Sequence, residues 1–215
     1  RRRIMYQRGM NIRFGGPITP AVKQLMIING SVFIIQKLCD ILYNAGILSI
    51  NIPKIFGLSH AGFAQSFMLW QPFTYMFLHG GWLHIIFNLI GLWMFGGELE
   101  QIWGKNRFFK YYILSGIGAG FFIAMMNYYV FSQTDISIPT IGASGAIYAI
   151  LLAYGLTWPN REVLLYFLLP VKIKYLLIVF GLMEFFGTLS SAAGTGGNIS
   201  HIGHVGGLIT GFILY

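Results

Sequence analysis

The sequence predicts an all-α, polytopic membrane protein built as a bundle of six transmembrane helices, and three observations favour this fold class. Hydrophobic residues make up 56% of the 215 residues and charged residues only 9%, with a mean hydropathy of +0.67. A soluble domain typically carries about 25% charged residues, so this chain has too little charge to solvate its surface. Repeated apolar runs approach the roughly 20 residues that a helix needs to cross a bilayer. Lysine and arginine, finally, gather in alternate connections between these runs.

The runs divide the chain into a basic N-terminal segment, residues 1–20, and a membrane domain, residues 21–215. The basic segment is expected to be a cytoplasmic leader and not a signal peptide, because the apolar run after it is long and has no small-residue cleavage site. The final span is still apolar at Tyr215 and is expected to be incomplete. The six spans are expected at residues 21–48, 79–95, 108–130, 142–157, 175–189 and 201–215.

Two apolar connections are expected to lie at the membrane surface. Residues 49–76 contain Pro53, Gly57, Gly62 and Pro72 among aromatic side chains. This stretch is too interrupted to span and too apolar for a solvated loop, so an interfacial structure in the headgroup region fits it. Residues 163–169 are too short to span and are expected at the cytoplasmic surface.

The basic residues orient the six spans. The N-terminal arginines, Lys105 to Lys110, and Arg161 to Lys174 all fall on one side if the N-terminus is cytoplasmic. Lysine and arginine favour the cytoplasmic side of membrane proteins, so this asymmetry predicts that spans two, four and six begin at the outer side.

The formal charge of +8 does not indicate a nucleic-acid partner, because the basic residues lie dispersed at the ends of apolar segments. Anionic lipid explains them better. The single cysteine, Cys39, excludes an intramolecular disulfide. The sequence contains no inverted repeat with paired broken helices, so it does not indicate a transporter.

Polar groups occur at one predicted depth in three spans that run in the same direction. His79, His84 and Asn88 open span two, Ser144 opens span four, and His201 and His204 open span six. Intramembrane histidine and asparagine are costly without partners, which favours a shared polar cavity. Glycines at 142, 145, 203, 207 and 211 would let spans four and six approach closely.

These groups are sufficient for an activated hydroxyl nucleophile. A histidine within hydrogen-bond reach of Ser144 would take its proton. His84 and Asn88 lie four residues apart on one helical face and offer donors for an oxyanion. We expect no aspartate or glutamate in the outer halves of the spans, since Asp135 lies in a loop, and the prediction is therefore a Ser–His dyad. The alternative is structural, because a glycine beside a serine in a membrane helix usually serves packing.

Three motifs together resemble the rhomboid family of bacterial intramembrane serine proteases. They are His79 with His84-x-x-x-Asn88, then Gly142-x-Ser144-Gly145-x-x-Tyr148, and then His204-x-x-Gly207-x-x-x-Gly211. The resemblance covers the whole predicted six-span core and implies a rhomboid-like bundle with a membrane-embedded first loop, in which span five is the lateral substrate gate.

The family's roles transfer residue by residue. Ser144 matches the nucleophile and His204 the general base, while His84, Asn88 and the Ser144 backbone N–H match the oxyanion donors. Tyr148 matches an aromatic residue that packs against the catalytic imidazole. Gly142, Gly145 and Gly207 match the packing glycines, and His79 is expected to be an auxiliary hydrogen-bonding group.

Two points qualify the match. His201 and His204 are three residues apart, and only the spacing of the downstream glycines assigns the base to His204. The family's first loop often contains Trp-Arg where this chain has Trp70-Gln71, which questions how the loop is anchored.

The sequence therefore predicts cleavage of single-span transmembrane proteins near the outer face of a bacterial inner membrane, with no metal or organic cofactor. An intramembrane metalloprotease lacks its His-Glu-x-x-His motif here, and an aspartyl protease lacks two intramembrane aspartates. A catalytically silent rhomboid-like protein that binds membrane clients is the remaining alternative.

Overall fold

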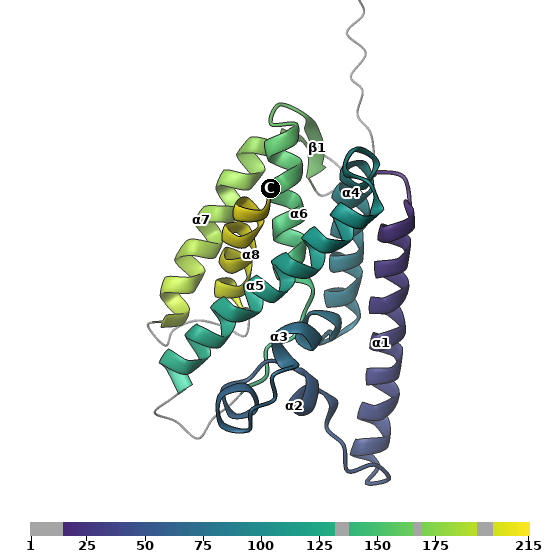
Figure 1. The fold of residues 1–215 in the computed structure, drawn as a ribbon, viewed down its shortest axis with the longest axis vertical. Coiled ribbons are helices and arrows are strands. Elements are labelled where there is room, and N and C mark those ends of the chain that lie inside the picture. The colour runs from purple at the N-terminus through teal and green to yellow at the C-terminus, as the bar shows by residue number, and fades with distance from the viewer. Residues whose placement is uncertain (1–14, 132–137, 166–168, 193–199) are drawn as a thin grey trace, which may run out of the picture.

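The computed structural model describes residues 15–131, 138–165, 169–192 and 200–215, and it is mainly helical (Figure 1). Four of its helices are long and apolar enough to cross a membrane, which supports an integral, multi-pass membrane protein. The two other apolar helices that were expected to span have 14 residues each, and a six-span count stays a prediction. The four long helices are α1 (Pro20–Asn44), α4 (Trp82–Trp103), α5 (Lys105–Phe131) and α7 (Ile173–Ala192), and the shorter two are α6 (Ser144–Thr157) and α8 (His201–Leu214).

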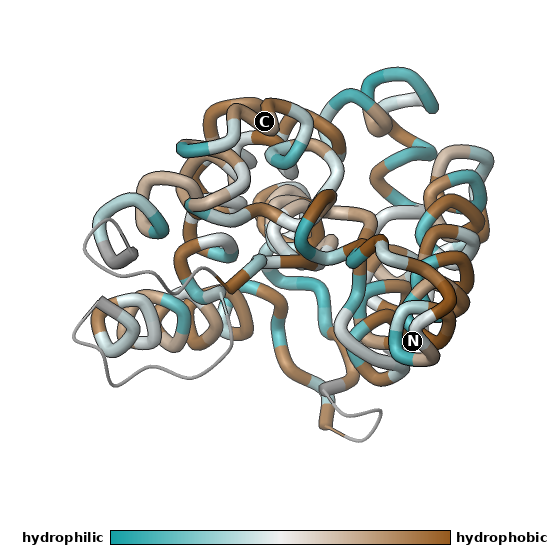
Figure 2. Tube along the Cα trace, turned by 90° about the horizontal axis from the view of Figure 1, so that it is seen from below, coloured by the Kyte–Doolittle hydropathy of each residue, from teal (hydrophilic) through white to brown (hydrophobic). Residues whose placement is uncertain are grey.

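The outer faces of the long helices are apolar and exposed. On α7, Ile178, Met183 and Phe186 are each more than half exposed, and α1 exposes Ile34 and Ile41 similarly. Figure 2, an end-on view, shows such apolar stretches distributed through the whole bundle. Hydrocarbon is the environment that solvates these faces at no cost, as expected for a chain of this composition.

The helix α4 runs eight residues beyond residue 95, where the second span was expected to end before Gly96-Gly97, so that predicted end is wrong. Both glycines lie inside the helix. A Cβ at Gly97 would come within 2.1 Å of the Pro17 carbonyl oxygen, so this glycine lets the extended segment before α1 cross the helix. The glycines here serve close packing, and the chain does not turn until Gly104, which has φ +78.

The first connection consists of short helical pieces. They are α2 (Ile52–Phe56), a π-helical turn η1 (Ala61–Gln65), α3 (Gln71–Thr74) and a 3₁₀ turn η2 (Tyr75–Phe77), grouped at the lower end in Figure 1. Leu58 and Thr140 exchange two backbone hydrogen bonds of 2.9 and 2.8 Å. The connection is thereby tied to the segment that leads into Ser144. Its interfacial location stays a prediction.

Gln71 anchors this connection from within. Its side chain is fully buried, accepts a hydrogen bond from the Ser59 N–H at 3.2 Å and donates to the Ile55 carbonyl at 3.2 Å. Trp70 donates from its indole to the same carbonyl at 2.9 Å. The Trp70-Gln71 pair thus ties together the polypeptide on either side of η1, with an amide where the family often has arginine.

A two-stranded antiparallel hairpin, β1 (Glu162–Leu165) with β2 (Leu169–Lys172), lies at the upper end of the bundle. The all-α bundle is confirmed, and this hairpin is the one pair of strands in the described residues. The register pairs Glu162 with Lys172 and Val163 with Val171. A hairpin supplies backbone hydrogen bonds to a segment too short for a membrane helix. The tip of the expected surface segment, residues 166–168, lies outside the described residues.

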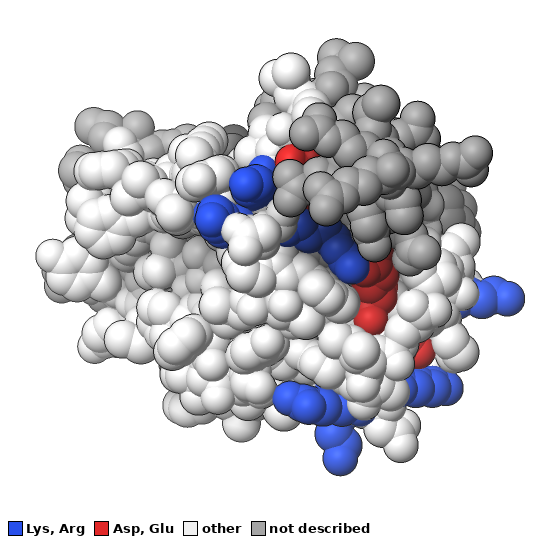
Figure 3. Space-filling view, turned by 90° about the horizontal axis from the view of Figure 1, so that it is seen from above, with Lys and Arg blue, Asp and Glu red and all other residues white. Residues whose placement is uncertain are grey.

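Charged side chains gather at this upper end (Figure 3). Arg161 donates to Glu98 of α4 and to the Tyr154 hydroxyl, and it packs over the Trp158 ring at 4.4 Å. Lys105 and Arg107 begin α5 at the same end. The basic leader at residues 1–14 and the loops at residues 132–137, with Asp135, and 193–199 lie outside the described residues.

A buried carboxylate caps the first helix. Glu100 of α4 is only 4% exposed and accepts hydrogen bonds from the Thr19 hydroxyl and from the backbone N–H groups of Ala21 and Val22, the latter at 2.9 Å. The N–H groups of a first helical turn have no partner within the helix, and negative charge there is favourable. Glu100 therefore supplies from another helix the cap that Thr19 does not provide.

Glu100→Ala is expected to lower the melting temperature in detergent by roughly 5 °C or more, because hydrogen bonds to a charged group contribute about 1.5–3 kcal/mol each. Circular dichroism or a thiol-independent dye assay would measure the shift. Glu162→Ala, at an exposed hairpin position, is the matched control and should change little. Equal shifts for the two variants would contradict the capping role.

Candidate active site

The helix α6 begins at Ser144 and lies at the centre of the candidate site. Its first backbone N–H groups have no partner within the helix. The preceding Gly142 has φ +136, a conformation that residues with a side chain rarely adopt, and its N–H donates to the Tyr75 carbonyl at 3.0 Å. The first connection and this glycine together set the direction in which the chain enters α6.

Two helices bring Ser144 and His204 together. The Ser144 Oγ lies 2.7 Å from His204 Nε2, across 60 residues of sequence. A Cβ at Gly207 would come within 2.0 Å of the Gly145 carbonyl oxygen, so α6 and α8 meet backbone to backbone about one turn farther along α8 than His204. The Tyr111 hydroxyl donates to Ala149 on α6 at 2.8 Å and approaches Gly211 on α8 at 3.1 Å, which holds the same pair of helices from α5.

The His204 ring is stacked on Tyr148. Their centroids are 4.3 Å apart and the rings are within 9° of parallel. Tyr148 is one helical turn beyond Ser144, so the helix that carries the hydroxyl also carries the surface on which the imidazole rests. The ring of His204 is therefore restricted to orientations that keep Nε2 toward Ser144.

His84 directs its Nε2 toward the space beside Gly142. Its Nδ1 accepts a hydrogen bond from the Gly80 N–H at 3.2 Å, so the neutral ring carries its proton on Nε2. A Cβ at Gly142 would lie 2.8 Å from that Nε2 and 3.7 Å from Ser144 Oγ. Both groups thus border the small space beside Gly142. An N–H donor next to a hydroxyl is the arrangement that an oxyanion hole needs.

Asn88 and His79 hold His84 in place. The Asn88 amide is buried and donates to the His84 carbonyl at 3.0 Å, one turn back on α4. The His79 ring is fully buried and packs edge-on against His84, with centroids 5.1 Å apart. Gln36 of α1 fixes the His79 main chain through two hydrogen bonds, of 3.0 and 3.1 Å.

The expectation that no carboxylate reaches these groups is wrong. Glu184 of α7 is 6% exposed, and its Oε2 lies 2.7 Å from His201 Nδ1 and 2.9 Å from His204 Nδ1. Its Oε1 accepts a hydrogen bond of 2.5 Å from the Tyr148 hydroxyl. The sequence holds a signal for it, because Glu184 is the one acidic residue in the fifth apolar run, and such residues are costly unless they have a use.

Glu184, His201 and His204 form the one group in the described parts of the chain whose donor atoms are close enough to hold a metal ion, within 4.8 Å of one another. Two histidines and a carboxylate are suitable zinc ligands. A metal on Nδ1 of His204 would, however, leave the proton on Nε2, and the ring could then not accept a proton from Ser144. Metal binding here and a serine activated by His204 exclude each other.

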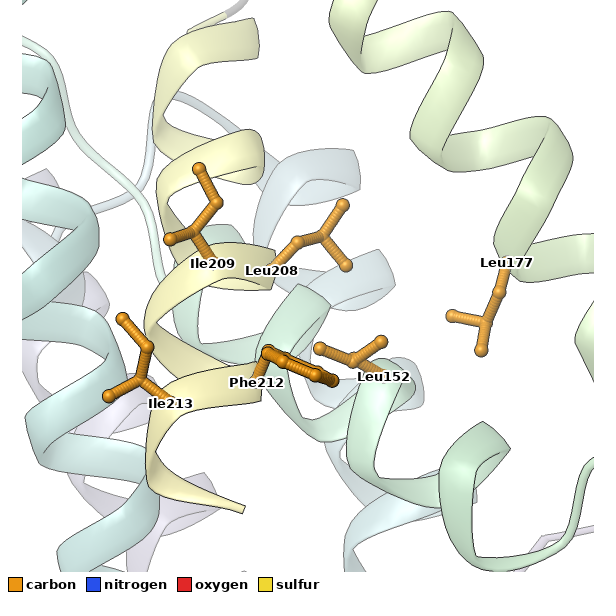
Figure 4. Close-up of a pocket in the computed structure, with 6 residues that line it drawn as sticks. All are labelled: Leu152, Leu177, Leu208, Ile209, Phe212 and Ile213. Carbon is orange, nitrogen blue, oxygen red and sulfur yellow. The ribbon is translucent and has the colours of Figure 1, made fainter.

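A separate apolar cavity of about 350 Å³ lies between α6, α7 and α8, toward the end of the bundle that holds Tyr215. Figure 4 shows Leu177 of α7 facing Leu208 and Phe212 of α8 across it. The cavity lining has no titratable group, so this cavity offers no acid or base for catalysis.

The sequence of the chain is similar to those of known proteins. A sequence model described as the rhomboid domain matches residues 66–215, which is well over half of the chain. The chain belongs to the rhomboid family. Among its relatives, the rhomboid protease GluP of Bacillus subtilis is 32% identical, over 79% of this chain and 30% of that protein.

Two further relatives resemble the chain over most of its length. The rhomboid protease GlpG of Pectobacterium atrosepticum is 26% identical over 98% of this chain and 67% of that protein. The chloroplastic rhomboid-like protein 11 of Arabidopsis thaliana is 27% identical over 81% of this chain and 62% of that protein. The chain thus spans from about a third to two thirds of the length of these relatives.

Proposed function

We propose that this protein is an intramembrane serine endopeptidase that cleaves transmembrane-helix substrates near the outer face of the membrane. The observation that carries the proposal is the 2.7 Å contact between Ser144 Oγ and His204 Nε2 within a membrane-helix bundle. A hydroxyl nucleophile is weak until a base within hydrogen-bond reach takes its proton. The names of the bacterial relatives, which are rhomboid proteases, support the same reaction.

In the proposed reaction Ser144 Oγ attacks the scissile carbonyl carbon while its proton passes to His204 Nε2. The imidazolium then gives this proton to the leaving amine, and an acyl-enzyme remains on Ser144. Water attacks the ester, passes its proton to His204, and the serine is restored. His84 Nε2–H, the Asn88 amide and the Ser144 backbone N–H stabilise the oxyanion in both steps.

The proposed substrates are single-span membrane proteins, whose helix must unwind locally to present a peptide bond. The positive-inside pattern supports a cytoplasmic N-terminus in a bacterial inner membrane, with the site toward the outer side. On this orientation the charged upper end of the bundle faces the cytoplasm. In this proposal the basic segment at residues 1–20 is cytoplasmic, and residues 21–215 form the peptidase membrane domain.

A fluorophosphonate probe separates the protease from a catalytically silent client-binding protein. The native protein in proteoliposomes should be labelled covalently on a single serine, and Ser144→Ala should not be labelled at all. Intact-mass measurement of both proteins would record this. A native protein that binds a transmembrane peptide without reacting with the probe would establish the silent binder instead.

Gly142→Ala is expected to lower kcat by about 10²-fold or more, the effect of losing one oxyanion donor. The added Cβ would meet His84 Nε2 at 2.8 Å and Cε1 at 2.9 Å and would require a strained backbone at φ +136. Gly81→Ala is the matched control, because a Cβ there meets nothing within 4 Å. Initial cleavage rates compare the two, and a Gly142→Ala protein as active as Gly81→Ala would remove His84 from the oxyanion site.

A further inference from the structure

Glu184 places a negative charge inside an otherwise apolar helix and connects three helices through it. The carboxylate accepts from Tyr148 on α6 and contacts His201 and His204 on α8. Its neighbours Met183 and Phe185 are more than half exposed on the outer face of α7, so the carboxylate is turned inward. An ionised carboxylate at membrane depth is expensive, and such residues face the bundle interior and commonly serve function.

We propose that Glu184 is a positioning residue for His204, so that Ser144, His204 and Glu184 form a triad and not the dyad expected from the sequence. The inference rests on the proposed function, because it describes how the same base is held. Its basis is geometric: Oε2 lies 2.9 Å from the Nδ1 of a ring whose Nε2 is 2.7 Å from Ser144 Oγ. The nucleophile and the orienting group therefore lie at opposite edges of one imidazole, which is the base.

The carboxylate determines which nitrogen of His204 carries the proton. A neutral imidazole beside Oε2 is favoured with its proton on Nδ1, which leaves the Nε2 lone pair to accept the proton of Ser144. When that proton arrives, the imidazolium has a negative neighbour that stays ionised throughout, as in soluble triads. Oε2 lies off the line of the Nδ1–H, so this nitrogen makes no aligned hydrogen bond in the resting protein. Catalytic hydrogen bonds often align only when substrate is bound.

Tyr148 fixes both partners at once. Its ring stacks on His204, and its hydroxyl holds Oε1 of Glu184 at 2.5 Å. Because Glu184 lies on α7, while Ser144 and His204 lie on α6 and α8, the triad is complete only while α7 is docked against both helices. The proposed reaction thus depends on the position of a helix that contributes neither nucleophile nor base.

Glu184→Gln tests the proposal in the full chain in proteoliposomes, because glutamine retains the shape and an acceptor for Tyr148. The kcat should fall by about 10²- to 10⁴-fold, the upper figure being the effect of the corresponding change in a soluble triad, while KM stays within about threefold. Fluorophosphonate labelling of Ser144 should slow in parallel. Met183→Leu, next to Glu184 but on the exposed face of α7, should retain the native kcat.

Glu184→Asp is the control for a loss of activity that is caused by misfolding alone. It keeps the charge one methylene farther from the ring and should retain kcat within about tenfold of the native value. An aspartate variant as inactive as Glu184→Gln would overturn the triad, and so would a glutamine variant with native kcat. If the native protein neither cleaves nor reacts with the probe, the proposed function fails instead.

Discussion

Ser144→Ala is expected to lower kcat for a transmembrane substrate by about 10⁴-fold or more, which corresponds to roughly 5.5 kcal/mol of transition-state stabilisation. The loss is large because the proposed reaction proceeds through a covalent acyl-enzyme, and in the described parts of the chain no other hydroxyl makes a hydrogen bond with the His204 ring. The measurement is the initial rate of cleavage of a labelled single-span substrate in proteoliposomes at saturating substrate.

A serine outside the site supplies the control. Ser115 of α5 is fully buried, and its hydroxyl has no hydrogen-bond partner, so Ser115→Ala removes the same atom elsewhere in the bundle. It should cleave at the native rate. If Ser144→Ala cleaves at the native rate, Ser144 is not the nucleophile, however well the variant binds substrate.

The helical bundle was predictable because composition and apolar run length depend only on the chain and the bilayer. The residues at which helices end were less predictable. The glycine pair at 96 and 97 resembles a helix end in sequence, yet it lies within α4 because Pro17 from another segment passes directly over it. Tertiary contact overrode the local preference there, and no window of sequence contains both partners.

The neighbours of Ser144 were predictable for a different reason. His84 and Asn88 near the start of α4, and His204 near the start of α8, are polar residues at helix ends like that of Ser144 on α6, and polar residues in a membrane must find one another. Glu184 was missed because the same reasoning was applied to helix ends only. It lies 12 residues into α7, and nothing in the spacing of the other groups points to it. The available signal was the free-energy cost of placing a carboxylate in the apolar interior of a membrane.

The first connection shows where sequence reasoning stops. Its composition predicts neither a π-helical turn nor the pairing of Leu58 with Thr140, which are 82 positions apart. Gln71 was read as the loss of a family arginine. In the structure its amide makes hydrogen bonds on both sides of the turn, and anchoring is thereby achieved with a neutral group that costs less to bury than a charge.

His204→Ala is expected to lower kcat by about 10³- to 10⁴-fold, whereas His201→Ala should stay within about tenfold of the native protein. His204 alone of the two rings contacts the serine, with Nε2 at 2.7 Å from Oγ. The His201 ring lies 6.4 Å from that of His204 and packs over Gly187 of α7, where its Nδ1 contacts Glu184. Cleavage rates and probe labelling of the two variants measure the difference.

Both histidines contact the same carboxylate oxygen of Glu184, so the two alanine variants should differ in stability as well as in activity. Removing His201 leaves Oε2 of Glu184 to His204 alone, so the orientation of the base is retained while one contact between α7 and α8 is lost. The His201→Ala protein should therefore melt at a lower temperature yet react with a fluorophosphonate at close to the native rate. His204→Ala should instead lose labelling altogether, because alanine provides no base however α7 is docked. If His201→Ala is instead the inactive variant, the base lies one turn earlier on α8 than the glycine spacing assigns, and Glu184 would then orient His201.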